Sequence, residues 1–465
     1  MSARRLLHLL VPAMALFCAF GLWRVIAELG LRLPLDPNEG WNAYHAAAAM
    51  AGTPLYPGPQ SFMINNYPPL SFYLVGALGG VLGDNIVAGR VVSLLSLGAV
   101  ALGIFAIARR MDCKRAPAAF AALWFVGGML AFTDYVGMDD PQLLAHALAI
   151  AGVLLLLREP RDALRIAAAA LLFVLAAFVK HNVVALALAA TAWLAAYDRR
   201  SALHLAISGL AFLLAGLILF RLVYGSSLLV HLVSARSYSF ADLRDGLEAW
   251  LPWSAVPLAG LVVLGVRRRP DRQVRFCLFY AAVGIALGAS FLGGAGVDAN
   301  VMFDADIALA LGIALLLDRL AHEAFAAAAA AACALPLVIG AWANADDDWY
   351  RAAYWLHPMR DEARLTRQDI AFLAAHRGPA LCAMLSFCYW AHKPATVDVF
   401  NVGEELKTGA RGDAQLAGTI AAHRFAVIQL DPDAPEPLGG AVSGAIDRHY
   451  RLDHADDNGS FYVPR

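Results

Sequence analysis

Four consecutive residues near the N-terminus, Asp36-Pro37-Asn38-Glu39, place two carboxylates directly after an apolar run over residues 6–27. Asp at the N-cap, Pro at the first helical position and Glu three residues after the cap are typical of a helix start. The same carboxylates, held at a membrane surface, could accept a proton from a hydroxyl group. Capping and general-base catalysis are compatible interpretations, because a cap also fixes a carboxylate in place.

A second acidic pair, Asp139-Asp140, stands at the start of another apolar run. A helix cap needs only one acid, and an ionised side chain beside lipid is costly, so a functional role is the default expectation. Asn300 and Asp304 are spaced by four residues at a third helix start, where capping is the favoured interpretation. The candidate catalytic acids are Asp36, Glu39, Asp139 and Asp140.

A cationic turn, Lys180-His181-Asn182, interrupts two apolar runs in a chain that has only four lysines. A lysine there could pair with a phosphate or pyrophosphate, as could Arg236 in the segment SARSYSF. An ordinary turn and an ordinary solvated loop arginine are the alternatives. The candidate residues for binding a donor phosphate are Lys180, His181 and Arg236.

A metal site is weakly indicated. His45 lies close to the first acids, but a single His without a spaced partner is more often a helix-face residue than a zinc ligand. The metal ligands are therefore unknown, and a divalent ion is the one cofactor that the acids leave open.

The composition indicates a membrane protein with a soluble extension. Of the 465 residues, 60% are hydrophobic and only 16% are charged. The net charge of -1 argues against a nucleic-acid partner. Runs of roughly 20 apolar residues, enough to cross a bilayer, recur up to residue 343 and then cease. We expect a membrane domain over residues 1–343 and a small soluble domain over 344–465, with the first run retained as a span.

Positive charge in short loops predicts the orientation of the spans. All six basic clusters can lie in the cytoplasm if the segment 69–83, which follows Pro68, is a juxtamembrane helix that does not cross. The eleven predicted spans are then residues 6–27, 86–108, 117–133, 141–157, 166–180, 182–198, 202–223, 250–266, 276–293, 305–320 and 324–343.

This orientation gathers the unusual residues on one side. The outer segments are 28–85, 133–140, 180–182, 224–249 and 293–304, and the charge rule used none of the candidate residues that they contain. The C-terminal domain also lies outside. An Ala- and Arg-rich, Lys-poor composition suggests a bacterium, so we expect a multi-pass protein of the inner membrane with a periplasmic C-terminal domain.

Several segments together resemble the GT-C class of membrane glycosyltransferases. The resemblance is closest to glycosyltransferase family 39, the protein O-mannosyltransferases and lipid A aminoarabinose transferases. It covers roughly residues 6–340. The segments that carry it are NEGWNAYHAAAAMAGTPLY, YPPLSFYL, GMDDPQLLAHALAIAGVLLLL, FVKHNVVALAL and GVDANVMFDADIALALG.

The resemblance implies a mostly α-helical transmembrane bundle and a sugar donor linked to polyprenyl or dolichyl phosphate. It also implies inverting transfer by an acid of the first outer loop. The family usually has adjacent Asp and Glu there, whereas Asn38 precedes Glu39 in this chain and the nearest Asp is Asp36. Asp139 or Asp140 would be the second-loop acid, and Lys180 would meet the donor phosphate. The candidate residues for positioning the substrate are Asn38, Tyr44, Tyr67 and Asn300.

In the C-terminal domain, segments typical of strands alternate with segments typical of helices, which predicts a small α/β fold. We expect strands at residues 380–385, 396–400 and 425–430 and helices at 366–377, 413–424 and 440–450. The sequence leaves undecided whether Cys382 and Cys388 form a disulfide. No cysteine spacing is typical of a metal site.

The expected function is transfer of a hexosyl or pentosyl group from a polyprenyl-phosphate donor to a lipid, glycan or protein acceptor at the outer membrane face. The alternatives are a transporter or flippase for a lipid-linked sugar, and a non-catalytic scaffold. Transporters place charges near the bilayer midplane and often contain internal repeats. Ionisable residues clustered at one face, without a repeat, favour the enzyme.

Overall fold

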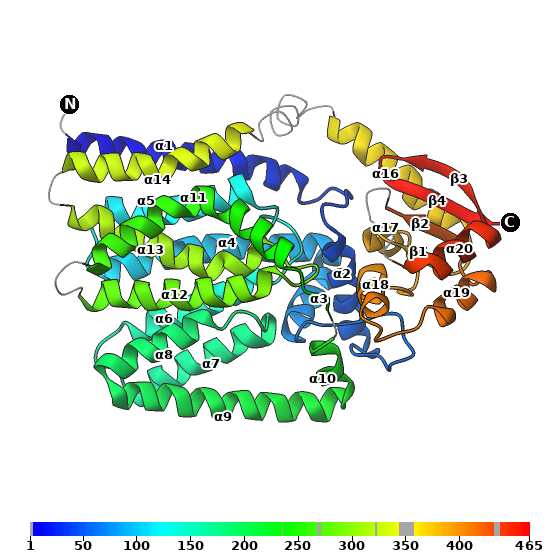
Figure 1. Cartoon of the computed structure of the whole chain (residues 1–465), viewed down its shortest axis with the longest axis horizontal. Coiled ribbons are helices and arrows are strands. Elements are labelled where there is room, and N and C mark those ends of the chain that lie inside the picture. Colours follow the sequence, from blue (N-terminus) through cyan, green and yellow to red (C-terminus); the bar gives the residue numbers. More distant parts are fainter. Residues whose placement is uncertain (1–2, 235, 267–270, 321–322, 344–357, 432–437) are drawn as a thin grey trace.

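The apolar runs form a bundle of long helices that ends against a small α/β domain (Figure 1). The computed structural model describes residues 3–234, 236–266, 271–320, 323–343, 358–431 and 438–465. Each of the eleven predicted spans is a helix. These helices are α1 (Ala3–Glu28), α4 (Asn85–Arg110), α5 (Arg115–Phe132), α6 (Gln142–Leu156), α7 (Ala163–Val179), α8 (Ala185–Tyr197), α9 (Arg199–Tyr224), α11 (Phe240–Val266), α12 (Arg272–Leu292), α13 (Phe303–Arg319) and α14 (Glu323–Ala343).

Eight helices in the described part of the chain are long and apolar enough to cross a membrane, by length and composition. They are α1, α4, α5, α9, α11, α12, α14 and α13 together with the 3-10 turn η1 (Ala299–Met302) that precedes it. The helices α6, α7 and α8 are shorter but run alongside the others in the bundle (Figure 1). The protein is therefore a multi-pass membrane protein.

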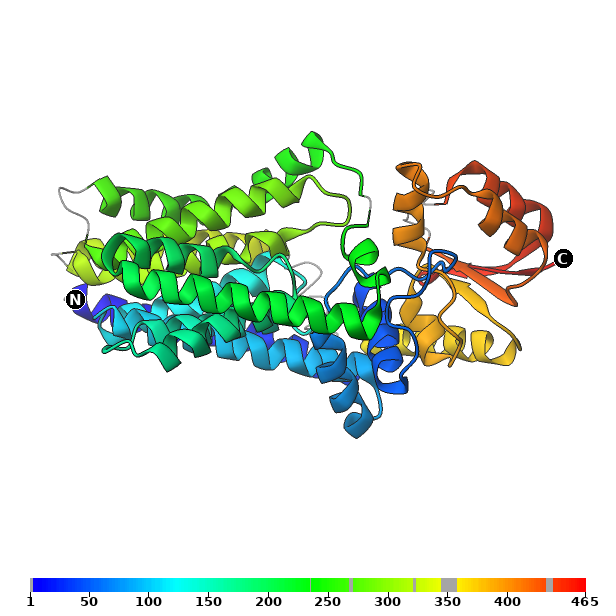
Figure 2. The same ribbon diagram turned by 90° about the horizontal axis from the view of Figure 1, so that it is seen from below.

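Three short helices lie at one end of the bundle, next to the C-terminal domain (Figures 1 and 2). They are α2 (Pro37–Ala51), α3 (Leu70–Leu82) and α10 (Ser227–Leu232). The segment predicted not to cross is α3, whose 13 residues pack beside α2 and the start of α4. The loops with the candidate residues converge on this same end.

The opposite end of the bundle carries the basic loops. There the backbone N–H of Lys114 donates to Asp318 at 2.8 Å, and Arg319 pairs with Asp271 at 2.6 Å. Alternating helix directions thus separate the basic loops from the candidate residues, as the charge pattern predicts.

The helix α13 is the centre of the bundle, because every residue from Phe303 to Leu317 is buried. In contrast, α9 lies at the edge of the bundle and exposes Leu203, Ile207 and Leu210 along one face (Figure 1). A central helix that is apolar all round and a peripheral helix with an exposed apolar face are typical of a bundle in lipid.

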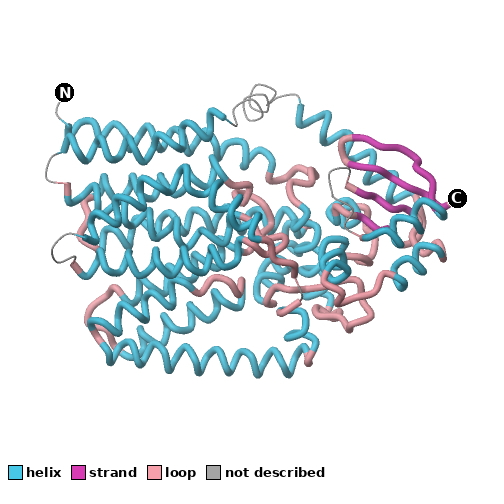
Figure 3. Tube along the Cα trace, in the orientation of Figure 1, coloured by secondary structure: helices cyan, strands magenta, loops and turns pink. Residues whose placement is uncertain are grey.

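The C-terminal domain is a four-stranded mixed sheet with helices, and it contains all the strands of the described chain (Figure 3). The strand order is β1-β2-β4-β3, with β1 parallel to β2 and the other pairs antiparallel. Its elements are α16 (Pro358–Ala375), β1 (Ala380–Cys382), α17 (Leu385–Trp390), α18 (Val399–Lys407), α19 (Ala414–Ala421), β2 (Val427–Leu430), α20 (Gly439–His449), β3 (Tyr450–Asp456) and β4 (Gly459–Pro464).

One predicted strand, residues 396–400, is wrong. The segment TVDVF is β-branched, but its Asp398 is the N-cap of α18 and accepts a hydrogen bond from the Asn401 N–H at 3.1 Å. Only Val397 keeps an isolated bridge, to Phe62. The open question of the disulfide is answered, because Cys382 and Cys388 are bonded. The predicted domain boundary at residue 344 falls outside the described residues.

Candidate functional site

The start of α2 has the cap that its sequence predicts. Asp36 is extended, and its Oδ1 accepts a hydrogen bond from the Asn38 N–H at 2.7 Å, with Pro37 at the first helical position. Glu39 does not return to the cap residue itself. Its Oε2 accepts from the N–H of Leu35, one residue earlier, at 3.2 Å.

Glu39 forms a fully buried ion pair with Arg90 of α4. The guanidinium donates from Nε to Oε1 at 2.7 Å and from Nη2 to Oε2 at 2.6 Å, a bidentate geometry. The N–H of Asp139 also donates to Oε1 at 3.2 Å. Arg90 further donates to the carbonyl oxygens of Glu28, Leu31 and Leu33. Glu39 therefore joins the segment after α1, α4 and the loop after α5, which suits a positioning role.

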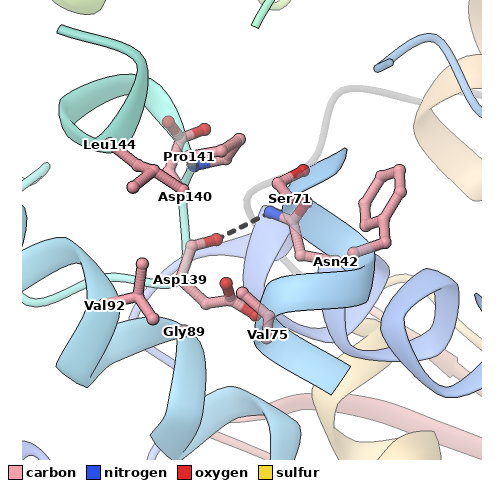
Figure 4. Close-up of a pocket in the computed structure, with 10 residues that line it drawn as sticks. Asn42, Ser71, Val75, Gly89, Val92, Asp139, Asp140, Pro141 and Leu144 are labelled. Atoms are coloured by element: carbon pink, nitrogen blue, oxygen red, sulfur yellow. Dashed lines mark hydrogen bonds between the residues drawn. The ribbon is translucent and has the colours of Figure 1, made fainter. Parts of the chain in front are cut away.

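The carboxylate of Asp139 is packed against α4 (Figure 4). Its carbonyl accepts from Asn42 Nδ2 at 2.6 Å, while its side chain points toward Gly89 and Val75 in a small pocket. Oδ2 is buried without a hydrogen-bond partner among the described residues. Burial, together with the charges of Glu39 and Asp140, raises the pKa of Asp139 well above its usual range.

Asp140 and Lys180 form a second buried ion pair, at 2.7 Å between Oδ2 and Nζ. Asp140 Oδ1 also accepts from the N–H of Gln142, the first residue of α6. Lys180 ends α7, and its Nζ donates to the Tyr67 hydroxyl at 2.8 Å and lies 4.0 Å from that ring's centroid. Burial alone would lower the pKa of Lys180, but the Asp140 carboxylate and Tyr67 together outweigh it and raise the pKa. The structure thus brings together three residues that the sequence predicted separately.

Asp36 is the acid whose environment best suits a general base. Its side chain is half-buried, and its hydrogen bond is to the adjacent turn at Asn38. Burial raises the pKa of Asp36 to about 6, and the charges of Asp140 and Glu39 contribute in the same direction. A carboxylate with a pKa close to neutral is matched to proton transfer at physiological pH.

Arg236 connects the bundle to the C-terminal domain. Its Nη1 donates to the Ala295 carbonyl at 3.0 Å and its Nη2 to Asn401 Oδ1 at 2.8 Å, and its guanidinium lies 5.1 Å from the Phe400 ring centroid. His181 follows Lys180 and is exposed. Both residues therefore lie at the end of the bundle where the acids gather.

Two predicted positioning residues face other partners. The Tyr44 hydroxyl donates to the Lys393 carbonyl at 2.8 Å, so it contacts the C-terminal domain instead of the acids. Asn300 is buried and donates to Gln142 at 3.3 Å, which ties the start of α13 to α6.

His45 is a packed residue of α2, with its ring centroid 4.4 Å from that of Trp41. Among the described residues, one group of three has ligand atoms close enough to share an ion: Asp369, His454 and Asp456. That group lies between α16 and β3 of the C-terminal domain, apart from the acids at the start of α2.

Three residues at the site escaped the sequence analysis: Arg90, Trp41 and Asp398. Arg90 carried a signal, since an arginine inside a predicted span is expected to have a specific role. Trp41 Nε1 donates to Asp398 Oδ2 at 2.9 Å across 357 positions of sequence, and nothing local in the sequence predicts that contact.

A larger cavity, of about 330 Å³, lies between the outer ends of α5 and α11 and the loop before α13. Its lining combines the aromatic rings of Phe132, Trp250 and Trp253 with acidic side chains. The acids that line it are Asp242, Asp245, Asp298 and Asp306.

Comparisons with known proteins agree with the fold. A family model described as a 6-pyruvoyl-tetrahydropterin synthase related domain, membrane protein, matches residues 64–240. No curated protein matches the chain by sequence. The crystal structure of ArnT from Cupriavidus metallidurans bound to undecaprenyl phosphate is similar, with a TM-score of 0.63, 12% identity and 97% coverage of both chains. The apo structure of the same ArnT gives 0.64 and 13%, with the same coverage. This likeness confirms a GT-C fold of the ArnT type.

Proposed function

We propose that the protein is a membrane glycosyltransferase that takes its sugar from a polyprenyl-phosphate donor. The observation that carries the proposal is the group formed by Lys180, Asp140 and Tyr67 beside Asp36, at one end of an ArnT-like bundle. A buried cation suits a donor phosphate, and a half-buried carboxylate with a raised pKa suits an acceptor hydroxyl. The binding of undecaprenyl phosphate by the similar ArnT supports the lipid carrier.

In the proposed reaction, the donor phosphate lies against Lys180 and Arg236. Asp36 accepts the proton of an acceptor hydroxyl while the acceptor oxygen attacks the anomeric carbon of the sugar. The bond between that carbon and the phosphate oxygen breaks, and polyprenyl phosphate leaves with the bonding electrons. Attack opposite the leaving group inverts the anomeric centre. Fixed cations stabilise the charge that develops on the departing phosphate.

The large cavity, lined by Asp242, Asp245, Asp298 and Asp306, offers room for a sugar-sized group. Its volume of about 330 Å³ lies at the lower end of the usual range for small-molecule sites. Carboxylates accept hydrogen bonds from hydroxyl groups, and the rings of Trp250 and Trp253 offer apolar surface. The same acids would repel a phosphate, which favours the sugar or the acceptor over the anionic part of the donor.

The charge pattern supports an outer, periplasmic position for the site and the C-terminal domain. Basic loops favour the cytoplasm, and the site lies at the other end of the bundle. The Cys382–Cys388 disulfide agrees with an oxidising compartment such as the bacterial periplasm. The proposed location is the inner membrane of a bacterium, and the proposed acceptor is a lipid, glycan or protein reached from outside.

The test is transfer of labelled sugar from synthetic undecaprenyl-phosphate sugars by the purified protein in detergent. We expect transfer with at least one donor, and a raised KM for that donor in Arg236→Gln. Arg200→Gln, an exposed arginine at the basic end, is the matched control and should leave KM unchanged. Absence of transfer with every donor, together with flipping of the lipid-linked sugar in liposomes, would instead establish a flippase.

A further inference from the structure

The C-terminal domain is packed closely against the outer loops of the bundle. The helices α2 and α17 touch at Gly40, where an added Cβ would lie 2.1 Å from the Ser386 nitrogen. Ser237, next to Arg236, donates to Glu404 of α18 from both its N–H and its Oγ, at 3.0 and 2.6 Å. The domain is therefore part of the same packed unit as the candidate site.

Asp398 lies at the centre of this contact and is almost fully buried, with 3% exposure. Its Oδ2 accepts a hydrogen bond from Trp41 Nε1 at 2.9 Å and another from Asn401 Nδ2 at 2.5 Å. Its Oδ1 accepts from the Asn401 N–H as the cap of α18. A buried carboxylate with this many donors is fixed in position and orients the groups that donate to it.

One branch of contacts leads from Asp398 to Arg236. Because Asn401 donates its amide Nδ2 to Asp398, its amide oxygen faces the other way and accepts from Arg236 Nη2 at 2.8 Å. Phe400, the residue before Asn401, supports the same guanidinium. The orientation of Arg236 thus depends on two neighbouring residues of α18.

A second branch leads from Asp398 to Lys180. The Trp41 ring, held by its N–H, packs edge-on against Tyr67 with centroids 4.9 Å apart. Tyr67 in turn accepts from Lys180 Nζ and presents its ring to the same ammonium group. The position of Lys180 therefore depends on Tyr67 as well as on Asp140, and the Tyr67 ring packs against Trp41.

We infer that Asp398 and Asn401 of the C-terminal domain are positioning residues for both cations of the proposed donor-phosphate site, Arg236 and Lys180. The inference rests on the proposed function. It assigns the C-terminal domain a role in donor binding: the domain sets the spacing of two cations that come from different loops of the bundle. Loss of the Asp398 or Asn401 side chain weakens binding of the phosphate. The base Asp36 and the chemical step depend on other contacts.

The test compares variants that lose a hydrogen bond in the contacts to Arg236 or Lys180 with a variant that loses a hydrogen bond elsewhere in the same interface. Asn401→Ala removes the contact to Arg236, and Trp41→Phe removes one N–H while keeping a ring against Tyr67. The control is Trp390→Phe, which removes a Trp hydrogen bond to Asp84, 3.0 Å long, across the same interface. Binding of undecaprenyl phosphate to the full-length protein in detergent is measured by calorimetry, with kcat, KM and the thermal midpoint of each variant.

We expect about tenfold to hundredfold weaker binding and a matching rise in KM for Asn401→Ala, with kcat nearly unchanged, because hydrogen bonds to charged groups have effects of that size. Trp390→Phe should bind as the wild type does. In an Arg236→Gln background, Asn401→Ala should cause little further loss, because residues that act through one another are not additive. A purely structural role for Asn401 would not produce this result.

Two outcomes separate the inference from the proposed function. Wild-type affinity in a folded Asn401→Ala protein, or full additivity with Arg236→Gln, would overturn the inference. If Asn401→Ala does not fold, Phe400→Leu provides the second measurement, since Phe400 is 44% exposed and supports the same guanidinium. Wild-type affinity in that variant would also count against the inference. Failure of the wild-type protein to bind undecaprenyl phosphate would instead reject the proposed function.

Discussion

Asp36 and Glu39 are three residues apart, yet their environments differ in kind. The cap position faces the junction of loop and helix, so Asp36 stays half-buried and bonds to its own turn. The third helical position faces α4, so Glu39 is enclosed and paired with Arg90. Of these two carboxylates, Asp36 is the one that we propose exchanges a proton with a ligand. The sequence identified both acids but not this division, because Arg90 lies 51 positions from Glu39.

The pH dependence of the reaction should follow Asp36. A general base works only when deprotonated, and its pKa is raised to about 6, so kcat/KM should rise with pH and level off above about 6. Asp36→Asn keeps the helix cap, since Asn and Asp are near-equivalent there. We expect it to fold normally, lose the acidic limb of the profile and transfer sugar about 10²–10⁴-fold more slowly. A folded Asp36→Asn protein with wild-type turnover would remove Asp36 from the mechanism.

The main effect of Glu39→Gln should be a lower free energy of unfolding of the protein. The substitution leaves the guanidinium of Arg90 buried without its counter-charge, and breaking such a pair is destabilising by about 3–5 kcal/mol. The control is Glu248→Gln, whose partner Arg244 is equally exposed, because surface pairs contribute only about 0–1 kcal/mol. Denaturant unfolding in detergent measures both. Equal unfolding midpoints for the two variants would show that the buried pair is dispensable.

At the scale of elements, the sequence predicted the spans well because their signal is local. Length and apolarity alone placed all eleven helices, whereas the exclusion of 69–83 as a span stays a prediction. The C-terminal domain was harder, because short strands and caps share residue types. TVDVF has the composition of a strand, yet Asp398 turns it into a helix start. The hairpin β3–β4 was missed although it carries Asn458-Gly459, a strong hairpin-turn signal.

The packing of the second outer loop on α4 depends on Gly89. An added Cβ there would lie 1.8 Å from Asp139 Oδ1 and 2.6 Å from Asp139 Cβ, so Gly89→Ala must displace the Asp139 side chain, next to Asp140. Gly98 lies on the same helix with nothing within 4 Å, so Gly98→Ala is the matched control. We expect Gly89→Ala to reduce transfer at least about tenfold, and Gly98→Ala to be neutral or slightly stabilising. Equal activity of the two variants would show that the loop position is not critical.

At the scale of the whole molecule, the basic loops and the candidate site lie at opposite ends of the bundle. The site end holds the candidate acids, Lys180 and Arg236, next to the C-terminal domain (Figure 1). The sequence predicted this separation from loop charges alone. It did not predict how the C-terminal domain contacts the site, because contacts such as Trp41 to Asp398 join opposite ends of the chain.

The proposed sidedness can be measured independently of any enzyme assay. The wild-type protein should give little background with a membrane-impermeant maleimide, because its four free cysteines are buried and the other two are bonded. Gln60→Cys, in the first outer loop, and Gln415→Cys, in the C-terminal domain, are both exposed and should label in spheroplasts. Arg200→Cys, exposed at the basic end, should label only after the membrane is permeabilised. Labelling of Arg200→Cys in intact spheroplasts, with protection of the other two, would place the site and the C-terminal domain in the cytoplasm. Transfer at the outer face would then be excluded, whatever activity the purified protein has in detergent.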